Sequence, residues 1–296
     1  MNHPDVPYPQ GPGPDFGGLP AELTDFATAR TLILPIPYDG TTSYVPGTRR
    51  GPAAILTASQ NVELYDEELE SSPCDTGIHT LPELDISDEG PEATVRRVEE
   101  ASRWAMSQDK FVIMLGGEHS LTPGAVRAAR ERWPDLSVLQ LDAHADLRDT
   151  YRDTPFSHAC AMRRVRESCP LVQLGIRNLS AEEHAWVKQE RIELGWGSTR
   201  KDQARWDQLL STLSPNVYLT IDLDAFDPSI CPGVGTPEPG GILWEEGLSI
   251  LKRVFAERNV VAADVMELCP LAGDIRSDFL AAKLVYKLVG YRQSTV

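Results

Sequence analysis

The sequence lacks the features that mark several large classes of protein. No apolar run approaches the roughly 18 residues that a membrane-spanning helix needs. The first 20 residues contain no lysine or arginine and no apolar stretch, so they do not resemble a signal peptide. Basic residues are scarce throughout, because 28 Lys and Arg against 44 Asp and Glu give a formal charge of −16. Nucleic acids and anionic membranes bind to basic surfaces, and we therefore expect neither as a partner.

Cysteine is also scarce and scattered. The five cysteines are odd in number and form no CxxC pair, which argues against a disulfide framework and against a zinc ribbon. Free thiols are typical of a reducing compartment, so we expect a cytoplasmic protein. Cys160 and Cys231 lie near candidate site residues in the sequence, and we interpret both as small packing residues rather than active thiols.

Proline and glycine are concentrated at the start of the chain. They make up ten of the first 20 residues, a composition that disfavours helices and strands. We interpret residues 1–30 as an extended arm, which becomes ordered only if something holds it. Residues 31–296 are interpreted as a single domain, since one α/β domain often exceeds 250 residues.

Short apolar runs alternate with amphipathic segments through this domain. The expected strands are residues 31–37, 111–115, 136–142, 171–175, 217–223 and 260–266, and the expected helices are residues 51–65, 93–106, 121–133, 180–190, 244–258 and 276–290. Strands that are apolar on both faces and alternate with such helices are typical of βαβ units. The sequence therefore predicts an α/β fold with an open parallel sheet that is covered on both faces.

Residues that can bind metal ions follow four of the expected strands. The set comprises His119, Asp142, His144, Asp146, Asp222, Asp224 and Glu267. Ligands of open parallel sheets bind outside the carboxyl ends of the strands, so these side chains are expected at one edge. Any one of them alone would more often be a helix cap or a satisfied core group. Their coincidence at a single edge favours a functional site.

The segment Asp142-Ala143-His144-Ala145-Asp146 carries the strongest signal. In an extended chain its three polar side chains point the same way, and a cation resolves the repulsion between their carboxylates. The four aspartates and two histidines exceed what one catalytic ion binds while keeping a position open. Two ions that share bridging carboxylates fit this set better, and the abundance of oxygen favours Mn²⁺ over structural zinc.

Three motifs resemble the signatures of the ureohydrolase family, which contains arginases and agmatinases. They are GGEHS (116–120), DAHAD (142–146) and DLDAFDP (222–228), and further matches lie at 37–55, 232–241 and 265–270. The similarity extends from about residue 31 to residue 290. It implies a three-layer αβα fold with a central, mostly parallel sheet of about eight strands, and two Mn²⁺ ions per chain.

The resemblance also implies a role for each site residue. One ion would be bound by His119, Asp142, Asp146 and Asp222, and the other by His144, Asp142, Asp222 and Asp224, with Asp142 and Asp222 as bridges. His158 occupies the position of a histidine that relays protons in the family. Glu267 matches a glutamate that orients the guanidinium of the substrate.

The implied reaction is the hydrolysis of a small cationic guanidino substrate. Hydroxide formed between the two ions would attack the guanidinium carbon, and an amine would leave with a proton relayed by His158. Of agmatine, arginine, guanidinobutyrate and formiminoglutamate, we expect agmatine, which yields urea and putrescine in polyamine biosynthesis. Residues 147–157 contain no Asn, whereas arginases use Asn and Ser in this loop to hold the α-groups of arginine.

Three alternatives to the agmatine assignment stay open at this point. Arg148 or Arg152 could bind a substrate carboxylate, which would make the enzyme a guanidinobutyrase or an arginase with the same chemistry. A catalytically silent relative that acts as a binding subunit is disfavoured, because all six ligand positions are filled.

Since relatives form trimers and hexamers, we also expect a homo-oligomer.

Overall fold

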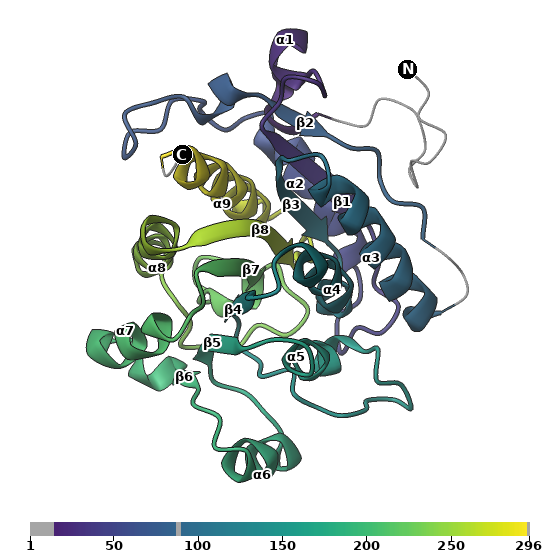
Figure 1. Cartoon of the computed structure of the whole chain (residues 1–296), viewed down its shortest axis with the longest axis vertical. Helices are drawn as coiled ribbons and strands as arrows, with labels where there is room; N and C mark the ends of the chain where they lie inside the picture. Colours follow the sequence, from purple (N-terminus) through teal and green to yellow (C-terminus); the bar gives the residue numbers. More distant parts are fainter. Residues whose placement is uncertain (1–14, 87–89, 295–296) are drawn as a thin grey trace.

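Eight parallel strands form the centre of the fold in the computed structural model, which describes residues 15–86 and 90–294 (Figure 1). The strands are β1 (Thr31–Ile36), β2 (Ile78–Thr80), β3 (Phe111–Gly116), β4 (Ser137–Leu141), β5 (Leu171–Ile176), β6 (Gly195–Trp196), β7 (Asn216–Asp222) and β8 (Asn259–Met266). Their order across the sheet is β2-β1-β3-β8-β7-β4-β5-β6, and every neighbouring pair is parallel. The predicted parallel sheet of about eight strands is confirmed.

Helices cover both faces of this sheet. One face packs against α2 (Gly51–Ser59), α7 (Gln203–Ser211), α8 (Trp244–Glu257) and α9 (Arg276–Gln293), and the other packs against α3 (Pro91–Met106), α4 (Thr122–Arg132), α5 (Ala161–Arg166) and α6 (Ala181–Gln189). Each face forms its own apolar core, because the residues of the central strands are buried on both sides. The three-layer αβα architecture is therefore confirmed.

The helix expected at residues 51–65 is shorter in the structure. It ends at Ser59, whose hydroxyl donates to the carbonyl of Leu56 and accepts a hydrogen bond from the backbone N–H of Gly17. Strands β2 and β6 were not predicted, because three and two residues are too short to show a periodicity. Helices α5 and α7 were missed as well.

Part of the predicted N-terminal arm packs on the domain. Residues 1–14 lie outside the described residues. Phe16 is buried in the core, and its backbone N–H donates to Thr80 Oγ1 over 2.8 Å. A short helix, α1 (Ala21–Thr24), follows before the first strand. From Phe16 onward the sheet edge and Ser59 supply the partners that the predicted arm needs in order to become ordered.

The four central strands carry the candidate site. Strands β3, β8, β7 and β4 are consecutive in the sheet, and they are the four strands after which the sequence places acids and imidazoles. Because all four run in the same direction, their carboxyl ends meet at one edge. Sheet order therefore brings together residues that are up to 148 positions apart along the chain, such as His119 and Glu267.

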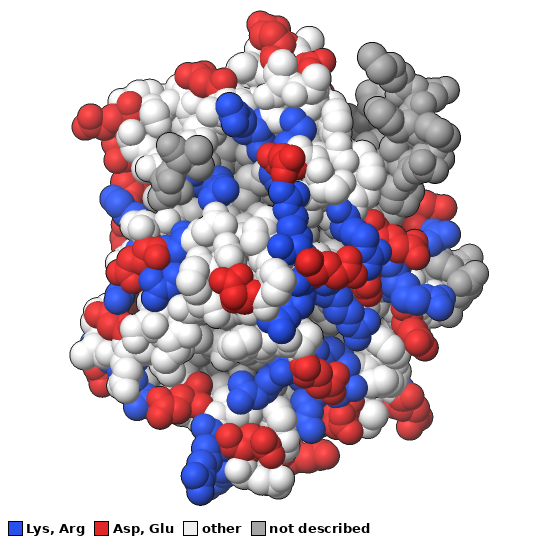
Figure 2. All heavy atoms as spheres, viewed as in Figure 1, with Lys and Arg blue, Asp and Glu red and all other residues white. Residues whose placement is uncertain are grey.

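The surface carries charges of both signs. On the face shown in Figure 2, Lys and Arg lie beside Asp and Glu, so the net charge of −16 does not produce a uniformly negative surface there. Within residues 15–86 and 90–294, no helix combines the length and the apolar character that crossing a bilayer requires.

Candidate active site

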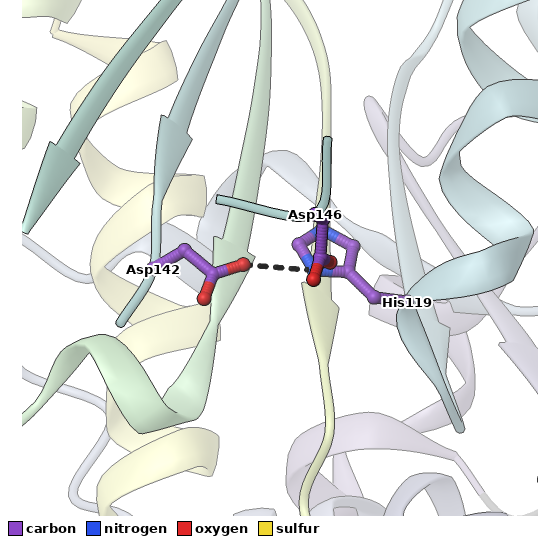
Figure 3. A group of neighbouring side chains, drawn as sticks. All are labelled: His119, Asp142 and Asp146. Atoms are coloured by element: carbon purple, nitrogen blue, oxygen red, sulfur yellow. Dashed lines mark ion pairs between the residues drawn. The ribbon is translucent and has the colours of Figure 1, made fainter. Parts of the chain in front are cut away.

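The structure brings the six predicted metal ligands together at the carboxyl edge of the sheet. His119 begins the 3₁₀ turn η4 (His119–Leu121) after β3, and Asp142 directly follows β4. Asp222 is the last residue of β7, and Asp224 lies in the turn η7 (Leu223–Ala225) that follows it. Figure 3 shows His119, Asp142 and Asp146 pointing toward one another, with an ion pair between the histidine and Asp142.

One ring nitrogen of His119 faces carboxylates without a hydrogen bond. Its Nδ1 lies 3.1 Å from Asp142 Oδ2, 3.5 Å from Asp146 Oδ2 and 3.3 Å from Asp222 Oδ2, yet it has no hydrogen-bond partner of acceptable geometry. The other nitrogen, Nε2, lies 2.8 Å from Thr220 Oγ1. If Nε2 donates to this hydroxyl, the neutral ring directs a lone pair at three buried carboxylates. This arrangement fits a bound cation, and it provides the first candidate metal position.

A second candidate position lies on the other side of Asp142. His144 Nδ1 is 2.8 Å from Asp224 Oδ2 and 3.7 Å from Asp142 Oδ1. Asp142 therefore presents Oδ2 to His119 and Oδ1 to His144. The ligand atoms of each group, His119 with Asp142 and Asp146, and Asp142 with His144 and Asp224, lie within 4.8 Å of one another. A carboxylate shared by two such groups has the geometry of a bridge between two metal ions.

The predicted bridging role of Asp222 stays a prediction. Its Oδ2 lies on the His119 side, whereas its Oδ1 accepts a hydrogen bond from the backbone N–H of Asp224 over 2.9 Å. Ligation by each of the six residues likewise stays a prediction that metal analysis can test.

Within the described part of the chain, no lysine or arginine pairs with the acids of this cluster. Among the described residues, no lysine or arginine nitrogen lies within 4.0 Å of a carboxylate oxygen of the four aspartates. Burial, together with the neighbouring Asp222 and Asp224, raises the pKa of Asp142 well above its usual range. Burial lowers the pKa of His144, but Asp224 and Asp142 outweigh it and raise that pKa to about 11. The site thus binds protons when it holds no other cation.

Backbone groups and amides fix the orientation of the acids. The N–H of Ala143 donates to Asp224 Oδ1 over 3.0 Å, and Gln140 Nε2 donates to Asp142 Oδ2 over 2.5 Å. Asp146 and Glu267 have φ angles of 52° and 66°, a left-handed conformation that non-glycine residues seldom adopt. Such conformations are often found where function requires a particular side-chain direction.

A glycine lets the loops of the site approach one another. A Cβ atom on Gly117 would lie 1.8 Å from the carbonyl oxygen of Tyr38, so no larger residue fits there. The next residue, Glu118, donates its backbone N–H to this same carbonyl over 2.8 Å. Glu267 donates its backbone N–H to the carbonyl of Gly117, also over 2.8 Å. The motif GGEHS thus joins the loop after β1 to the loop after β8.

A cleft of about 190 Å³ opens directly beside this cluster. Its lining includes Asp146, Asp222 and Asp224 as well as both predicted catalytic residues, His158 and Glu267. The two catalytic residues were predicted from separate segments of the sequence, and the structure places both on the same cleft.

His158 lies in the turn η5 (His158–Cys160) with its ring held by polar and aromatic neighbours. Its Nδ1 is 3.2 Å from Ser157 Oγ and 3.3 Å from Thr41 Oγ1, and its ring stands perpendicular to that of Tyr151. Burial, and then the nearby His144, lower the pKa of His158 to about 4. The imidazole is therefore neutral at pH 7, the state from which it can accept a proton.

Glu267 lies at the end of β8 and contacts the first metal ligand. Its Oε1 accepts a hydrogen bond from the backbone N–H of His119 over 2.8 Å. Burial, and then the neighbouring Asp222 and Glu118, raise the pKa of Glu267 well above its usual range. A cation in the cleft would favour its ionised form, which suits the predicted contact with a guanidinium.

Sequence reasoning assigned no role to several residues of the cleft, because they come from separate loops and, for Glu183, from α6, and no local pattern shows that they meet. They are Thr42, Ser43, Tyr151, Asn178 and Glu183. The stretch 37–55 was recognised as similar to the family, but no role was assigned to its residues. Arg148 lies at the cleft with its Nε 3.8 Å from Glu183 and its guanidinium over the Tyr151 ring, so it already has two partners.

The two cysteines near the site are buried thiols with raised pKa values. Cys160 and Cys231 are fully buried, and burial raises their pKa values to about 11 and about 12, respectively. Neither residue lines the cleft, although Ala159 does. Their predicted role as packing residues agrees with this environment.

Comparison with known proteins establishes the family. The family model described as the arginase family matches residues 29–290. The chain belongs to the arginase family. It is 42% identical over 278 residues to the N(1)-aminopropylagmatine ureohydrolase of Synechocystis sp., and the match covers 91% of each chain.

Two further relatives of this arginase-family chain carry related names. The agmatinase of Pyrococcus horikoshii is 35% identical, with 90% of this chain and 93% of that protein covered. The crystal structure of the agmatine ureohydrolase of Thermoplasma volcanium superposes with a TM-score of 0.85 at 30% identity, and the match covers 92% of this chain and 93% of that one. The predicted family and enzyme class are confirmed: the protein is a ureohydrolase, a hydrolase of guanidino compounds.

Proposed function

We propose that this enzyme hydrolyses agmatine to urea and putrescine and that it requires two Mn²⁺ ions per chain. The observation that carries the proposal is the pair of ligand groups that share Asp142, each with one histidine and buried carboxylates. Oxygen-rich ligation of this kind suits Mn²⁺.

The residues of the chain divide the work of this reaction. Two bound ions would lower the pKa of a water molecule and so supply hydroxide at neutral pH. The carboxylates of the cluster make the cleft attractive to a cationic guanidinium, and Glu267 can pair with its N–H groups. His158, neutral and on the same cleft, can accept a proton and deliver it to the departing amine.

The far end of the substrate decides between agmatine and its analogues. Glu183 also lies on the cleft, where its oxygens accept hydrogen bonds from the backbone N–H groups of Leu147 and Ser180. Arg148 is engaged with Glu183 and Tyr151, which leaves it poorly placed to serve a substrate carboxylate. These contacts favour an amine tail over the carboxylate tails of arginine and guanidinobutyrate.

The comparisons favour a second candidate substrate, N(1)-aminopropylagmatine. A relative with 42% identity over nine-tenths of both chains is named for this compound. It contains the same guanidinobutyl group as agmatine and extends it by an aminopropyl chain, so its hydrolysis would release urea and spermidine. The chemistry at the cluster would be unchanged.

A urea-release assay across four compounds tests the proposal. We expect kcat/KM for agmatine to exceed that for arginine and for guanidinobutyrate by on the order of 10³-fold, since an unpaired desolvated carboxylate costs several kcal/mol. A higher kcat/KM for N(1)-aminopropylagmatine than for agmatine would select the second candidate. Preference for arginine would overturn the assignment of an amine-tailed substrate.

A further inference from the structure

Glu118 is a fully buried carboxylate beside the site, and its oxygens accept hydrogen bonds from Thr41 and Ser120 rather than from the metal ligands. Its Oε2 accepts a hydrogen bond from the backbone N–H of Thr41 over 2.6 Å. Its Oε1 accepts from the hydroxyls of Thr41 and Ser120, each over 2.5 Å. Burial raises the pKa of Glu118, but the three donors directed at its two oxygens favour the ionised form, which acts only as an acceptor.

Thr41 connects this carboxylate to His158. A threonine hydroxyl has a single hydrogen, and here that hydrogen is directed at Glu118. Toward His158, the oxygen of Thr41 can therefore only accept. It accepts from the backbone N–H of His158 over 3.0 Å, and it lies 3.3 Å from the ring Nδ1.

This constraint favours one tautomer of the imidazole. A hydrogen bond from the His158 ring to the Thr41 oxygen exists only if Nδ1 carries the hydrogen. In a neutral ring, Nε2 is then unprotonated. The hydroxyl of Ser157 lies 3.2 Å from Nδ1 and can either donate or accept, so it is compatible with this tautomer.

We propose that Glu118, acting through Thr41, is a positioning residue that holds His158 in the Nδ1–H tautomer with Nε2 free to accept a proton. The proposal rests on the proposed function, in which His158 relays a proton. It explains why the motif GGEHS contains a glutamate at position 118, which ligation of a metal ion by His119 does not explain. A glutamine cannot replace it, since its amide N–H₂ would donate to the threonine and reverse the direction of the chain of hydrogen bonds.

Isosteric replacement provides the test. In Glu118→Gln, the amide can donate to Thr41 Oγ1, so that the threonine hydroxyl turns to His158 and favours the opposite tautomer. We expect kcat to fall on the order of 10-fold to 100-fold, with KM changed by less than about threefold and metal content unaltered. Thr41→Val removes the acceptor and should give a similar loss, whereas Thr41→Ser keeps it and should retain kcat within about threefold.

A spectroscopic measurement separates positioning from loop stability. With ¹⁵N-labelled histidine and Zn²⁺ as a diamagnetic ion, NMR should report His158 as the Nδ1–H form in the wild-type enzyme and in Thr41→Ser. The Nε2–H form should appear in Glu118→Gln. An unchanged tautomer in that variant would overturn the inference, as would a loss of activity that follows a loss of metal.

The failure of this inference differs from the failure of the proposed function. The tautomer of His158 is measured without substrate, so it tests Glu118 even if the substrate is not agmatine. An Nδ1–H ring that changes in Glu118→Gln supports the inference whichever guanidino compound is hydrolysed. A wild-type ring in the Nε2–H form contradicts it, even when agmatine is a good substrate.

Discussion

Two clusters of charge around buried side chains are built in opposite ways in this enzyme. In the first, Lys287 is 2% exposed and lies 2.8 Å from Asp66 and 2.9 Å from Glu68, while the hydroxyl of Tyr291 donates to Glu68. In the second, the four aspartates of the active site face two histidines and no lysine or arginine of the described chain.

The comparison shows what makes a buried acidic cluster structural or functional. The Lys287 cluster contains its own counter-ion, so it ties α9 to the segment after α2 and needs nothing from solution. Among the described residues, the active-site aspartates have no lysine or arginine partner, so a bound ion, or protons on the acids and histidines, must balance their charge. The locations of the two clusters also differ. The residues of the Lys287 cluster do not line the cleft, whereas His144, Asp146, Asp222 and Asp224 do.

Removing the shared carboxylate should produce the largest effect. Asp142 faces both histidines, so Asp142→Asn weakens both candidate metal positions at once. We expect kcat/KM to fall on the order of 10³-fold or more, with a loss of bound metal. The urea-release rate and elemental analysis on the same sample measure both quantities. Wild-type metal content together with wild-type activity would show that Asp142 is not a ligand.

Replacing His158, the predicted proton relay, should lower kcat strongly without changing the metal content. His158 lies on the cleft outside both ligand groups, so His158→Ala should lower kcat by roughly 10²-fold to 10⁴-fold while metal content stays normal. Loss of metal in this variant would make His158 a ligand instead. An unchanged kcat would remove it from the reaction.

Breaking the internal ion pairs should affect stability rather than catalysis. Lys287→Met leaves Asp66 and Glu68 without their buried cation, which should lower the free energy of unfolding by about 3–5 kcal/mol. Denaturant unfolding of the metal-loaded enzyme measures this loss. The value of kcat per folded chain should stay at the wild-type level, and a large decrease would contradict the division between the two clusters.

Much of the fold and the cluster was predictable because the signals are local. Strands β3, β4, β7 and β8 are short, mostly apolar runs, and each of the six ligands lies within five residues of a strand end. Parallel strands place such ends at one edge of the sheet, which the sequence could predict, whereas the order β3-β8-β7-β4 that makes them neighbours is visible only in the structure. The homo-oligomeric state remains a prediction.

Other features depend on contacts between distant loops, which no local pattern reveals. Thr41 and Glu118 are 77 residues apart, and only the folded structure shows their paired hydrogen bonds. Asp142 presents one oxygen to His119 and the other to His144, and only the folded structure shows the directions of these side chains. The positive φ angles of Asp146 and Glu267 are imposed by the surrounding loops rather than by residue type.

The smallest predicted effect concerns the free energy of unfolding, which should depend on pH in opposite directions for the Lys287 cluster and for the active-site cluster. Although burial opposes it, Lys252, Lys287 and Tyr291 lower the pKa of Glu68 to about 2, so its stabilisation is complete above its usual pKa and is lost as the pH falls toward 2. Burial raises the pKa values of Asp146 to about 7 and Asp222 to about 6, so metal-free protein should lose stability as the pH rises from about 4 to 7.

Thermal unfolding of the metal-free enzyme between pH 4 and pH 8 checks this contrast. The melting temperature should fall as the pH rises, and added Mn²⁺ should remove most of that dependence because the ions replace the protons. A metal-free enzyme that becomes more stable across this range would mean that the aspartates are balanced by some other group.

The number of metal ions in the fully active enzyme tests the central claim most directly. Metal-free protein is titrated with Mn²⁺ while urea release from agmatine and bound metal are measured on the same samples. The shared position of Asp142 between two ligand groups predicts that activity reaches its maximum at two ions per chain. Full activity with a single ion per chain, or activity in the metal-free protein, would contradict the account.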